Sequence, residues 1–232
     1  TELTLEAYLT NEVTQMVSTK LLDIVLVLDQ SGSMADSFGN VTRQAAMKNA
    51  VNAFIEEVAA KNADHRMAIV TFGSDAQRLV EWTTVDDSGK TQLTDAISGL
   101  PKNPSGATNV GAGMEVAKLL MDSATDTDRQ KVVIVFTDGV PTTTTDFNTN
   151  VANTAIKTAK TMKEKGVIVY AVGIFNGANP DEMYGASGFD TNSDGTVGSE
   201  WGEDNWGFFP DTDFPKTDRP AGNRFLNLVS SN

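Results

Sequence analysis

The stretch Leu21-Leu-Asp-Ile-Val-Leu-Val-Leu-Asp29-Gln-Ser31-Gly-Ser33-Met decides the fold. A continuous run of apolar, mostly branched residues leads directly into a polar turn. An unbroken run of this kind, without alternation, is typical of a strand buried on both faces of a parallel sheet. Three further runs have the same character: Met67–Phe72, Lys131–Asp138 and Val167–Ile174. The sequence therefore predicts four buried strands.

Helical patterns lie between these runs, because apolar residues there recur every three or four positions. The three sets are Met47, Val51, Phe54 and Val58; Val110, Met114, Ala117 and Leu120; and Val151, Ala155, Ala159 and Met162. The alternating segment 78–85 predicts an edge strand with one solvated face. Strands that alternate with helices predict an α/β fold: a doubly wound, mostly parallel central sheet flanked by helices, with one antiparallel edge strand.

The chain of 232 residues suits one large α/β domain. We expect residues 1–20 to form a lead-in strand or arm from a preceding module, and residues 21–232 to form the domain. Residues 176–220 have no sustained period and many Gly, Asp and Pro, which predicts an insertion. The start at Thr1, with neither Met nor a leader, indicates a fragment of a longer protein.

Charge and composition exclude several function classes. The formal net charge is -13, from 31 acidic and 18 basic residues, and residues 181–218 supply ten acids against one base. The absence of a basic run argues against nucleic acid or an anionic membrane as partner. No apolar run approaches the roughly 20 residues of a membrane span, so direct membrane insertion is not expected. Zero Cys excludes disulfides and thiolate catalysis.

Polar side chains stand where the predicted strands end, which is where open α/β sheets bind ligands. Asp29, Ser31 and Ser33 follow the first strand, Asp138 ends the third buried strand, and Thr108 precedes the second periodic helix. Carboxylate and hydroxyl oxygens suit Mg²⁺, with Mn²⁺ or Ca²⁺ as alternatives. Because two carboxylates only balance a divalent ion, the metal would remain electrophilic toward an acidic group from outside. The sequence predicts a metal site suited to capturing an Asp or Glu of a partner.

The same strand-end residues also admit three other interpretations: helix caps, a phosphotransferase and a hydrolase triad. Ser and Asp after strands often serve only as helix caps. A phosphotransferase could use Asp29 as nucleophile, but it would need a second Asp at the position of Ser31. A hydrolase triad would need His65, the single histidine. His65 precedes the second buried strand, at the sheet end opposite Asp29, and we expect it to be solvated or locally bonded.

Two further motifs are weaker. Gly111-Ala-Gly113 begins like a dinucleotide-binding loop but lacks the third glycine, which favours a closely packed helix start. Asp190, Asn192 and Asp194 copy the first half of a calcium-binding loop, but Trp201 stands where a bidentate Glu is expected. A second calcium site and an acidic turn without metal both stay open.

The Asp-x-Ser-x-Ser motif, Thr108 and the Thr-Asp-Gly strand end at 137–139 together resemble a von Willebrand factor type A domain with its metal-ion-dependent adhesion site. The resemblance covers residues 21–175 and 221–232. It implies that Ser31, Ser33 and Thr108 are hydroxyl ligands, and that Asp29 and Asp138 ligate directly or through water. The sixth position is then left to water or a partner carboxylate.

The lead-in to Asp29, and the run 170–175 followed by Ala-Asn-Pro at 178–180, resemble type A domains of Gram-positive surface and pilus-tip adhesins. That resemblance implies a bacterial cell-surface location in a larger, wall-linked protein with flanking modules. We expect a non-enzymatic adhesion domain whose Mg²⁺ captures an acidic side chain of an extracellular host or matrix protein. The alternatives are an intracellular scaffold of a metal-chelatase or ATPase complex and a Mg²⁺-dependent phosphotransferase.

Overall fold

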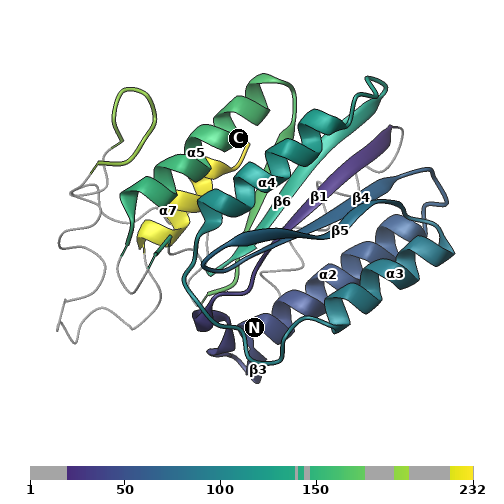
Figure 1. Cartoon of the computed structure of the whole chain (residues 1–232), viewed down its shortest axis with the longest axis horizontal. Coiled ribbons are helices and arrows are strands. Elements are labelled where there is room, and N and C mark those ends of the chain that lie inside the picture. Colours follow the sequence, from purple (N-terminus) through teal and green to yellow (C-terminus); the bar gives the residue numbers. More distant parts are fainter. Residues whose placement is uncertain (1–19, 139–140, 144–146, 176–190, 199–219, 232) are drawn as a thin grey trace.

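The computed structural model describes residues 20–138, 141–143, 147–175, 191–198 and 220–231 (Figure 1). Their elements, in chain order, are β1 (Leu21–Asp29), the short 3₁₀ helix η1 (Gly32–Ala35), β2 (Ser37–Phe38), β3 (Val41–Thr42), α2 (Arg43–Ala59), β4 (Arg66–Phe72), β5 (Ala76–Thr84), α3 (Asp87–Ser98), α4 (Val110–Ser123), β6 (Arg129–Thr137), α5 (Thr149–Glu164), β7 (Ile168–Gly173) and α7 (Pro220–Val229). No helix among these residues is long and apolar enough to cross a membrane.

The central sheet has the strand order β5-β4-β1-β6-β7. Strands β4, β1, β6 and β7 run parallel, and β5 pairs with β4 in the antiparallel direction at the edge. From β1 the chain winds first toward β4 and then returns to β6 on the other side of β1. This confirms the predicted doubly wound, mostly parallel sheet with an antiparallel edge strand. The reversal of winding brings the carboxyl ends of β1 and β6 together, where such sheets bind ligands.

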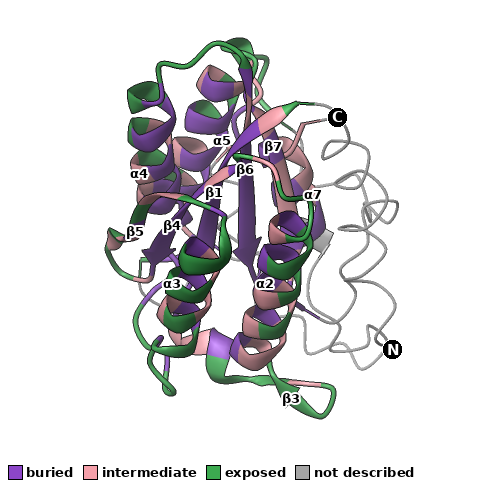
Figure 2. Ribbon diagram, turned by 90° about the vertical axis from the view of Figure 1, so that its right-hand side faces the viewer, coloured by how far each residue is buried: buried purple, intermediate pink, exposed green. Residues whose placement is uncertain are grey.

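Helices cover both faces of the sheet, with α2 and α3 on one face and α4, α5 and α7 on the other (Figure 1). Along β1, Val25 and Val27 belong to the core under α4, α5 and α7, whereas Ile24, Leu26 and Leu28 belong to the core under α2 and α3. Figure 2 shows β1, β4 and β6 almost wholly buried and the helices buried along their inner sides. Burial on both faces explains the unbroken apolar run of β1.

The three helices predicted from their apolar repeats are α2, α4 and α5, and the residues that mark each repeat are buried. Helix α3 was not predicted, because Leu93 and Ile97 are the only large apolar residues that this helix buries. The lead-in segment 1–20 lies outside the described residues except for Lys20. The predicted insertion 176–220 lies outside them except for 191–198 and Pro220.

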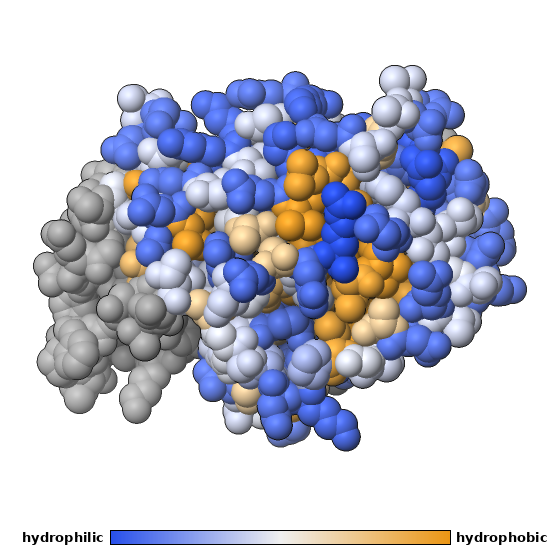
Figure 3. Space-filling model, in the orientation of Figure 1, coloured by the Kyte–Doolittle hydropathy of each residue, from blue (hydrophilic) through white to orange (hydrophobic). Residues whose placement is uncertain are grey.

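The face that carries α4 and β5 is mixed in character. Figure 3 shows a band of hydrophobic residues crossing this face, with hydrophilic residues around it. Leu119 of α4 is 56% exposed, and Trp82 of β5 and Val116 of α4 are partly buried against the core. The rest of this face is mainly hydrophilic, as expected for a surface in contact with water.

Candidate metal centre

Asp29 is the last residue of β1 and is completely buried. Its Oδ1 accepts a hydrogen bond from the backbone N–H of Ser31 at 2.7 Å. Its Oδ2 accepts a hydrogen bond from the Thr137 hydroxyl, also at 2.7 Å. These two bonds fix the carboxylate at the carboxyl end of the sheet, and each oxygen keeps a lone pair for a further partner.

The surroundings of Asp29 disfavour the charged form of its carboxyl group. Burial, the larger cause, and the nearby charge of Asp138 together raise the pKa of Asp29 to about 7. Hydrogen bonds from Ser31 and Thr137 act in the opposite direction but do not cancel these effects. Two carboxylates held close together in a buried place resist joint ionisation. A bound cation would remove this conflict.

Ser31 and Ser33 stand in the turn that follows β1. Their hydroxyl oxygens lie 3.2 Å apart, so the two side chains converge as the spacing of two residues predicts. Ser31 is buried, whereas Ser33 is partly exposed. Met34, fully buried in the core under α2, anchors the 3₁₀ turn that carries Ser33. The turn thus presents two hydroxyls beside the Asp29 carboxylate, with one side toward solvent.

Thr108 comes from a distant part of the chain and is brought in by backbone hydrogen bonds. The loop before α4 is tied to the turn after β1, because the N–H of Gly32 donates to the carbonyl of Gly106 at 3.0 Å. Gly106 has φ +97, a left-handed conformation that favours glycine. Thr108 itself is buried, and its N–H donates to the Thr142 hydroxyl at 3.0 Å. The loop position of Thr108 is therefore fixed from both sides.

Asp138 directly follows β6 and is also buried. Its Oδ2 accepts a hydrogen bond from Nη1 of Arg43 at 3.1 Å. Arg43 begins α2, so a cation from a different layer reaches this carboxylate. Neither Arg43 nor Thr137 was predicted as a member of the site. Thr137 stands in the Thr-Asp-Gly motif at 137–139, which was a signal for its role, but no local motif marks Arg43.

The donor set fits a hard divalent cation. All five predicted residues lie at the carboxyl end of the sheet and offer only carboxylate and hydroxyl oxygens, which Mg²⁺, Mn²⁺ and Ca²⁺ prefer. Within the described ranges there is no cluster of three or more His, Cys, Asp or Glu side chains able to hold a metal. The chain has no Cys, and its single histidine precedes β4 at the opposite end of the sheet, so a softer metal would find neither thiolate nor imidazole here.

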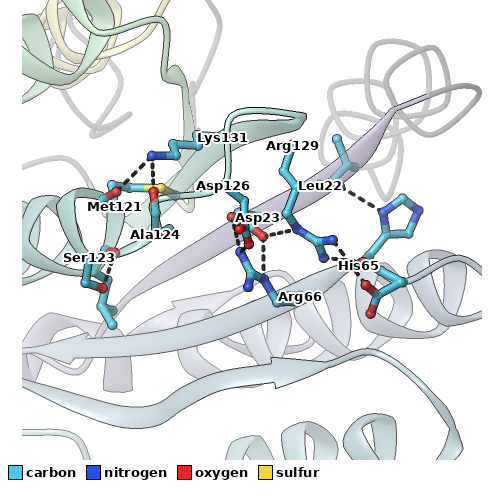
Figure 4. A network of polar contacts seen from close by, with 12 residues as sticks. Leu22, Asp23, His65, Arg66, Met121, Ser123, Ala124, Asp126, Arg129 and Lys131 are labelled. Carbon is cyan, nitrogen blue, oxygen red and sulfur yellow. Dashed lines mark hydrogen bonds and ion pairs between the residues drawn. The ribbon is translucent and has the colours of Figure 1, made fainter.

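His65 lies at the other end of the sheet, in the network of Figure 4. Its Nδ1 accepts the backbone N–H of Leu22 at 3.1 Å, and the ring is buried. The expectation of local bonding is confirmed, and that of solvation is wrong. Between Leu22 and Asp29 lies about 23 Å of extended strand, so His65 cannot form a triad with Asp29.

The same end of the sheet holds a buried ion cluster (Figure 4). Asp23, fully buried on β1, accepts hydrogen bonds from Arg66 at 2.6 and 2.8 Å and from Arg129 at 2.7 Å. Although burial raises the pKa of Asp23, the two guanidinium groups outweigh it and lower that pKa below 3.8. Paired charges of this kind join three neighbouring strands, and both carboxylate oxygens of Asp23 accept hydrogen bonds from arginine.

The two weaker motifs have structural explanations. Gly113 lies where α4 crosses the sheet, and a Cβ there would be 2.9 Å from Cδ1 of Phe72, so the glycines allow close helix packing as predicted. In the turn 191–198, Oδ1 of Asp194 accepts hydrogen bonds from both the N–H and the hydroxyl of Thr196, at 3.0 and 2.6 Å. Asp190 and Trp201 lie outside the described residues, so the calcium hypothesis stays a prediction.

Comparisons with known proteins agree with this fold. The model of the von Willebrand factor type A domain family matches residues 23–194. BatB from Bacteroides thetaiotaomicron is 16% identical, with a TM-score of 0.57 over 90% of this chain and 85% of that chain. The pilus adhesin SpaC from Lactobacillus rhamnosus GG is 22% identical, with a TM-score of 0.54 over 67% of this chain and 25% of that chain.

The PilB minor pilin from Streptococcus sanguinis is 17% identical, with a TM-score of 0.56 over 68% of this chain and 51% of that chain. At these identities the likeness is one of fold. The chain therefore corresponds to about a quarter of SpaC and half of PilB. Comparison with curated protein sequences gave no significant match.

Proposed function

The chain belongs to the von Willebrand factor type A domain family, and from that premise we propose that it is a non-enzymatic adhesion domain. A divalent metal ion, Mg²⁺ in the first place, would be held by Asp29, Ser31, Ser33, Thr108 and Asp138. The metal would capture an acidic side chain of an extracellular host or matrix protein. The protein would act at a bacterial cell surface, as part of a larger molecule.

The observation that carries this proposal is the meeting of two buried carboxylates, Asp29 and Asp138, with neutral hydroxyl donors. Hydroxyls contribute oxygen ligands without charge, so the protein ligands of a divalent ion there would carry no more than two negative charges. Arg43 lies 3.1 Å from Asp138 and also 3.7 Å from the exposed carboxylate of Asp36. A metal in such surroundings attracts an anionic ligand strongly, which favours capture of a carboxylate.

The non-enzymatic role is supported by what the described residues place around the site. No histidine approaches Asp29, because His65 lies at the opposite end of the sheet. Ser31 stands where a phosphotransferase would carry its second aspartate. These two features support a centre that binds a carboxylate over one that transfers a phosphoryl group or uses a histidine base.

The surface location is supported by the fold relatives SpaC, a pilus adhesin, and PilB, a minor pilin. The same fold occurs in the SpRpn10 VWA domain, whose name indicates neither a pilus nor an adhesin, so the fold alone does not establish a surface location. The chemistry of the centre, in which a bound metal would have a coordination position for an external carboxylate, is what favours adhesion.

The test is binding of the purified chain to immobilised extracellular matrix proteins, in Mg²⁺ and in EDTA. Asp29→Ala should abolish binding to the same extent as EDTA. The matched control is Asp95→Ala, which removes an equal charge from the exposed side of α3 and should bind like wild type. Titration calorimetry with Mg²⁺ should show one site that Asp29→Ala removes. Matrix binding that is reduced neither by EDTA nor by Asp29→Ala would refute the metal-bridge function.

A further inference from the structure

A hollow of about 560 Å³ lies between α3 and the edge strand β5, two elements that Figure 1 shows side by side. Pockets that bind small ligands in proteins usually measure roughly 300–1,000 Å³. Helix α3 and the loop after it form one side through Ala96 and Leu100, and β4 and β5 form the other through Thr71 and Leu79. The hollow is therefore large enough for a side chain of a partner together with part of its backbone.

The hollow shares a wall with the candidate metal centre. Gln30 and Ser105 both line it, and the N–H of Ser105 donates to the carbonyl of Gln30 at 3.1 Å. Gln30 follows Asp29 directly, and the next pair of loop residues is joined by the N–H of Gly32 donating to the carbonyl of Gly106 at 3.0 Å. A partner whose carboxylate reaches the metal centre would therefore bring its neighbouring residues to the hollow.

Side-chain amides hold this wall in place. Gln44 of α2 is buried, and its Nε2 donates to Oε1 of Gln30 at 2.9 Å and to the carbonyl of Pro101 at 2.6 Å. The Nε2 of Gln30 in turn donates to the carbonyl of Asp29 at 2.7 Å. Because these bonds fix the shape of the wall before any ligand arrives, binding in the hollow would require little ordering of the protein.

A buried hydroxyl without a partner lies in the hollow. Thr71 is only 4% exposed, and its register beside Leu28 and Gln77 places it on the face of the sheet that α2 and α3 cover. Within the described part of the chain, no hydrogen bond reaches the Thr71 hydroxyl. Buried hydroxyls in proteins usually have a hydrogen-bond partner. The hydroxyl can therefore donate to or accept from a group that enters the hollow.

The rest of the lining favours an uncharged, largely apolar side chain. Leu79 and Leu100 present apolar surface. Charges of both signs stand around the hollow, because Asp75 lines it, Lys48 donates to the carbonyl of Leu100 at 2.9 Å, and Lys102 lies close enough to Lys48 to lower its pKa. Neither sign prevails, so a charged side chain gains no clear advantage there.

We propose that the hollow is a second binding site, which receives a tyrosine side chain of the partner whose carboxylate binds the metal. The ring would pack against the apolar lining, and its hydroxyl would bond to Thr71. Tyrosine combines apolar area with a hydroxyl at its far end, as this lining requires. The link to the captured carboxylate rests on the proposed function, whereas binding of the tyrosine itself needs no metal.

The experiment titrates the full chain in EDTA with three probes and follows backbone amide shifts by NMR. The probes are N-acetyl-tyrosinamide, N-acetyl-phenylalaninamide and N-acetyl-lysinamide. Thr71→Val removes the hydroxyl and keeps the branched shape, and Ala96→Leu places a larger side chain in the hollow. Thr83→Val is the matched control on β5, because Thr83 lies outside the lining and its hydroxyl donates to the carbonyl of Glu81. Thermal unfolding checks that each variant folds.

The tyrosine probe should shift the amides of Gln30, Leu79, Ala96 and Ser105. It should bind roughly three- to tenfold more tightly than the phenylalanine probe, as one hydrogen bond provides, and the lysine probe should bind most weakly. Thr71→Val should reduce the affinity for the tyrosine probe to that for the phenylalanine probe, and Ala96→Leu should weaken both. Thr83→Val should match wild type.

A peptide tests the link to the metal centre. Acetylated Asp-Gly-Tyr amide should bind roughly tenfold more tightly in Mg²⁺ than in EDTA, because the two contacts reinforce each other, and acetylated Asn-Gly-Tyr amide should show no such gain. Absence of shifts around the hollow, equal affinity for the tyrosine and phenylalanine probes, or a preference for the lysine probe would overturn the inference. If calorimetry showed no Mg²⁺ binding, the proposed function would fail while tyrosine binding in EDTA would stand.

Discussion

Replacing Asp29 with Asn should stabilise the metal-free protein, and the gain should increase with pH. Asp29 is completely buried, and burial together with the charge of Asp138 raises its pKa from 3.8 to about 7. A carboxyl group whose pKa is higher in the folded state loses its proton more readily on unfolding. Stability is therefore lost as pH rises from about 4 to about 7.

The magnitude follows from the two pKa values. At pH 8 the difference between 3.8 and about 7 corresponds to about 4 kcal/mol of destabilisation in wild type. At pH 5 only the pH interval between 3.8 and 5 contributes, and the destabilisation is about 1–2 kcal/mol. Asn keeps the shape and can accept the N–H of Ser31 while its amide donates to the Thr137 hydroxyl, so the variant avoids the penalty without leaving a cavity.

The assay is urea unfolding of wild type and Asp29→Asn in EDTA from pH 5 to pH 8. Subtracting the unfolding free energy of one protein from that of the other removes the contribution of the titratable groups that both contain. We expect Asp29→Asn to be more stable throughout, and the difference to grow by about 2–3 kcal/mol over this range. Asp95→Asn, on the exposed side of α3, serves as the control and should show no such trend. Adding Mg²⁺ should reverse the order, because only wild type would keep both carboxylate ligands.

A difference that does not change between pH 5 and pH 8, or an Asp29→Asn variant less stable than wild type at pH 8, would refute this reasoning. Either result would mean that the charge of Asp29 is well compensated in the metal-free protein. The expected result would instead identify Asp29 as a residue kept at a cost to stability, which is common at binding sites.

Three further predictions concern the fold around the centre. Asp23→Asn should lower the unfolding free energy in urea at pH 7 by roughly 3–5 kcal/mol, because it leaves buried arginine charge without its main partner. The control Asp122→Asn breaks only surface ion pairs, so its unfolding free energy should stay within about 1 kcal/mol of wild type. Gly113→Ala should lower stability by about 1–3 kcal/mol despite the better helix propensity of alanine, because its Cβ would lie 2.9 Å from Phe72. Burial and the charge of Arg129 lower the pKa of His65, so neutral His65 contributes fully to folding stability above pH 6.5, and this contribution is lost as pH falls below 6.5. The unfolding free energy of wild type relative to His65→Gln should therefore shrink between pH 7.5 and 5.5. A constant difference would contradict this.

The sequence by itself determined the strands of the central sheet and predicted five oxygen donors. A strand buried on both faces must be apolar at every position, so β1 is recognisable from Ile24 to Leu28 without any neighbour. Strand ends of a parallel sheet meet at one edge, so Asp29 and Asp138 could be placed together from the chain alone. The helices α2, α4 and α5 were equally visible, because each buries a regular stripe of apolar residues.

Other features were decided only by tertiary structure, because they depend on contacts between distant residues. Helix α3 has too few apolar residues for a periodic pattern, and it packs closely against the end of β5 through Gly89. The sequence predicted that His65 is solvated or locally bonded, and only the fold brings the N–H of Leu22 to its Nδ1. Arg43 lies 95 residues from Asp138 in the chain, so their ion pair leaves no local signal in the sequence. Local periodicity reports burial, whereas the charge balance of a site depends on which side chains the folded chain brings together.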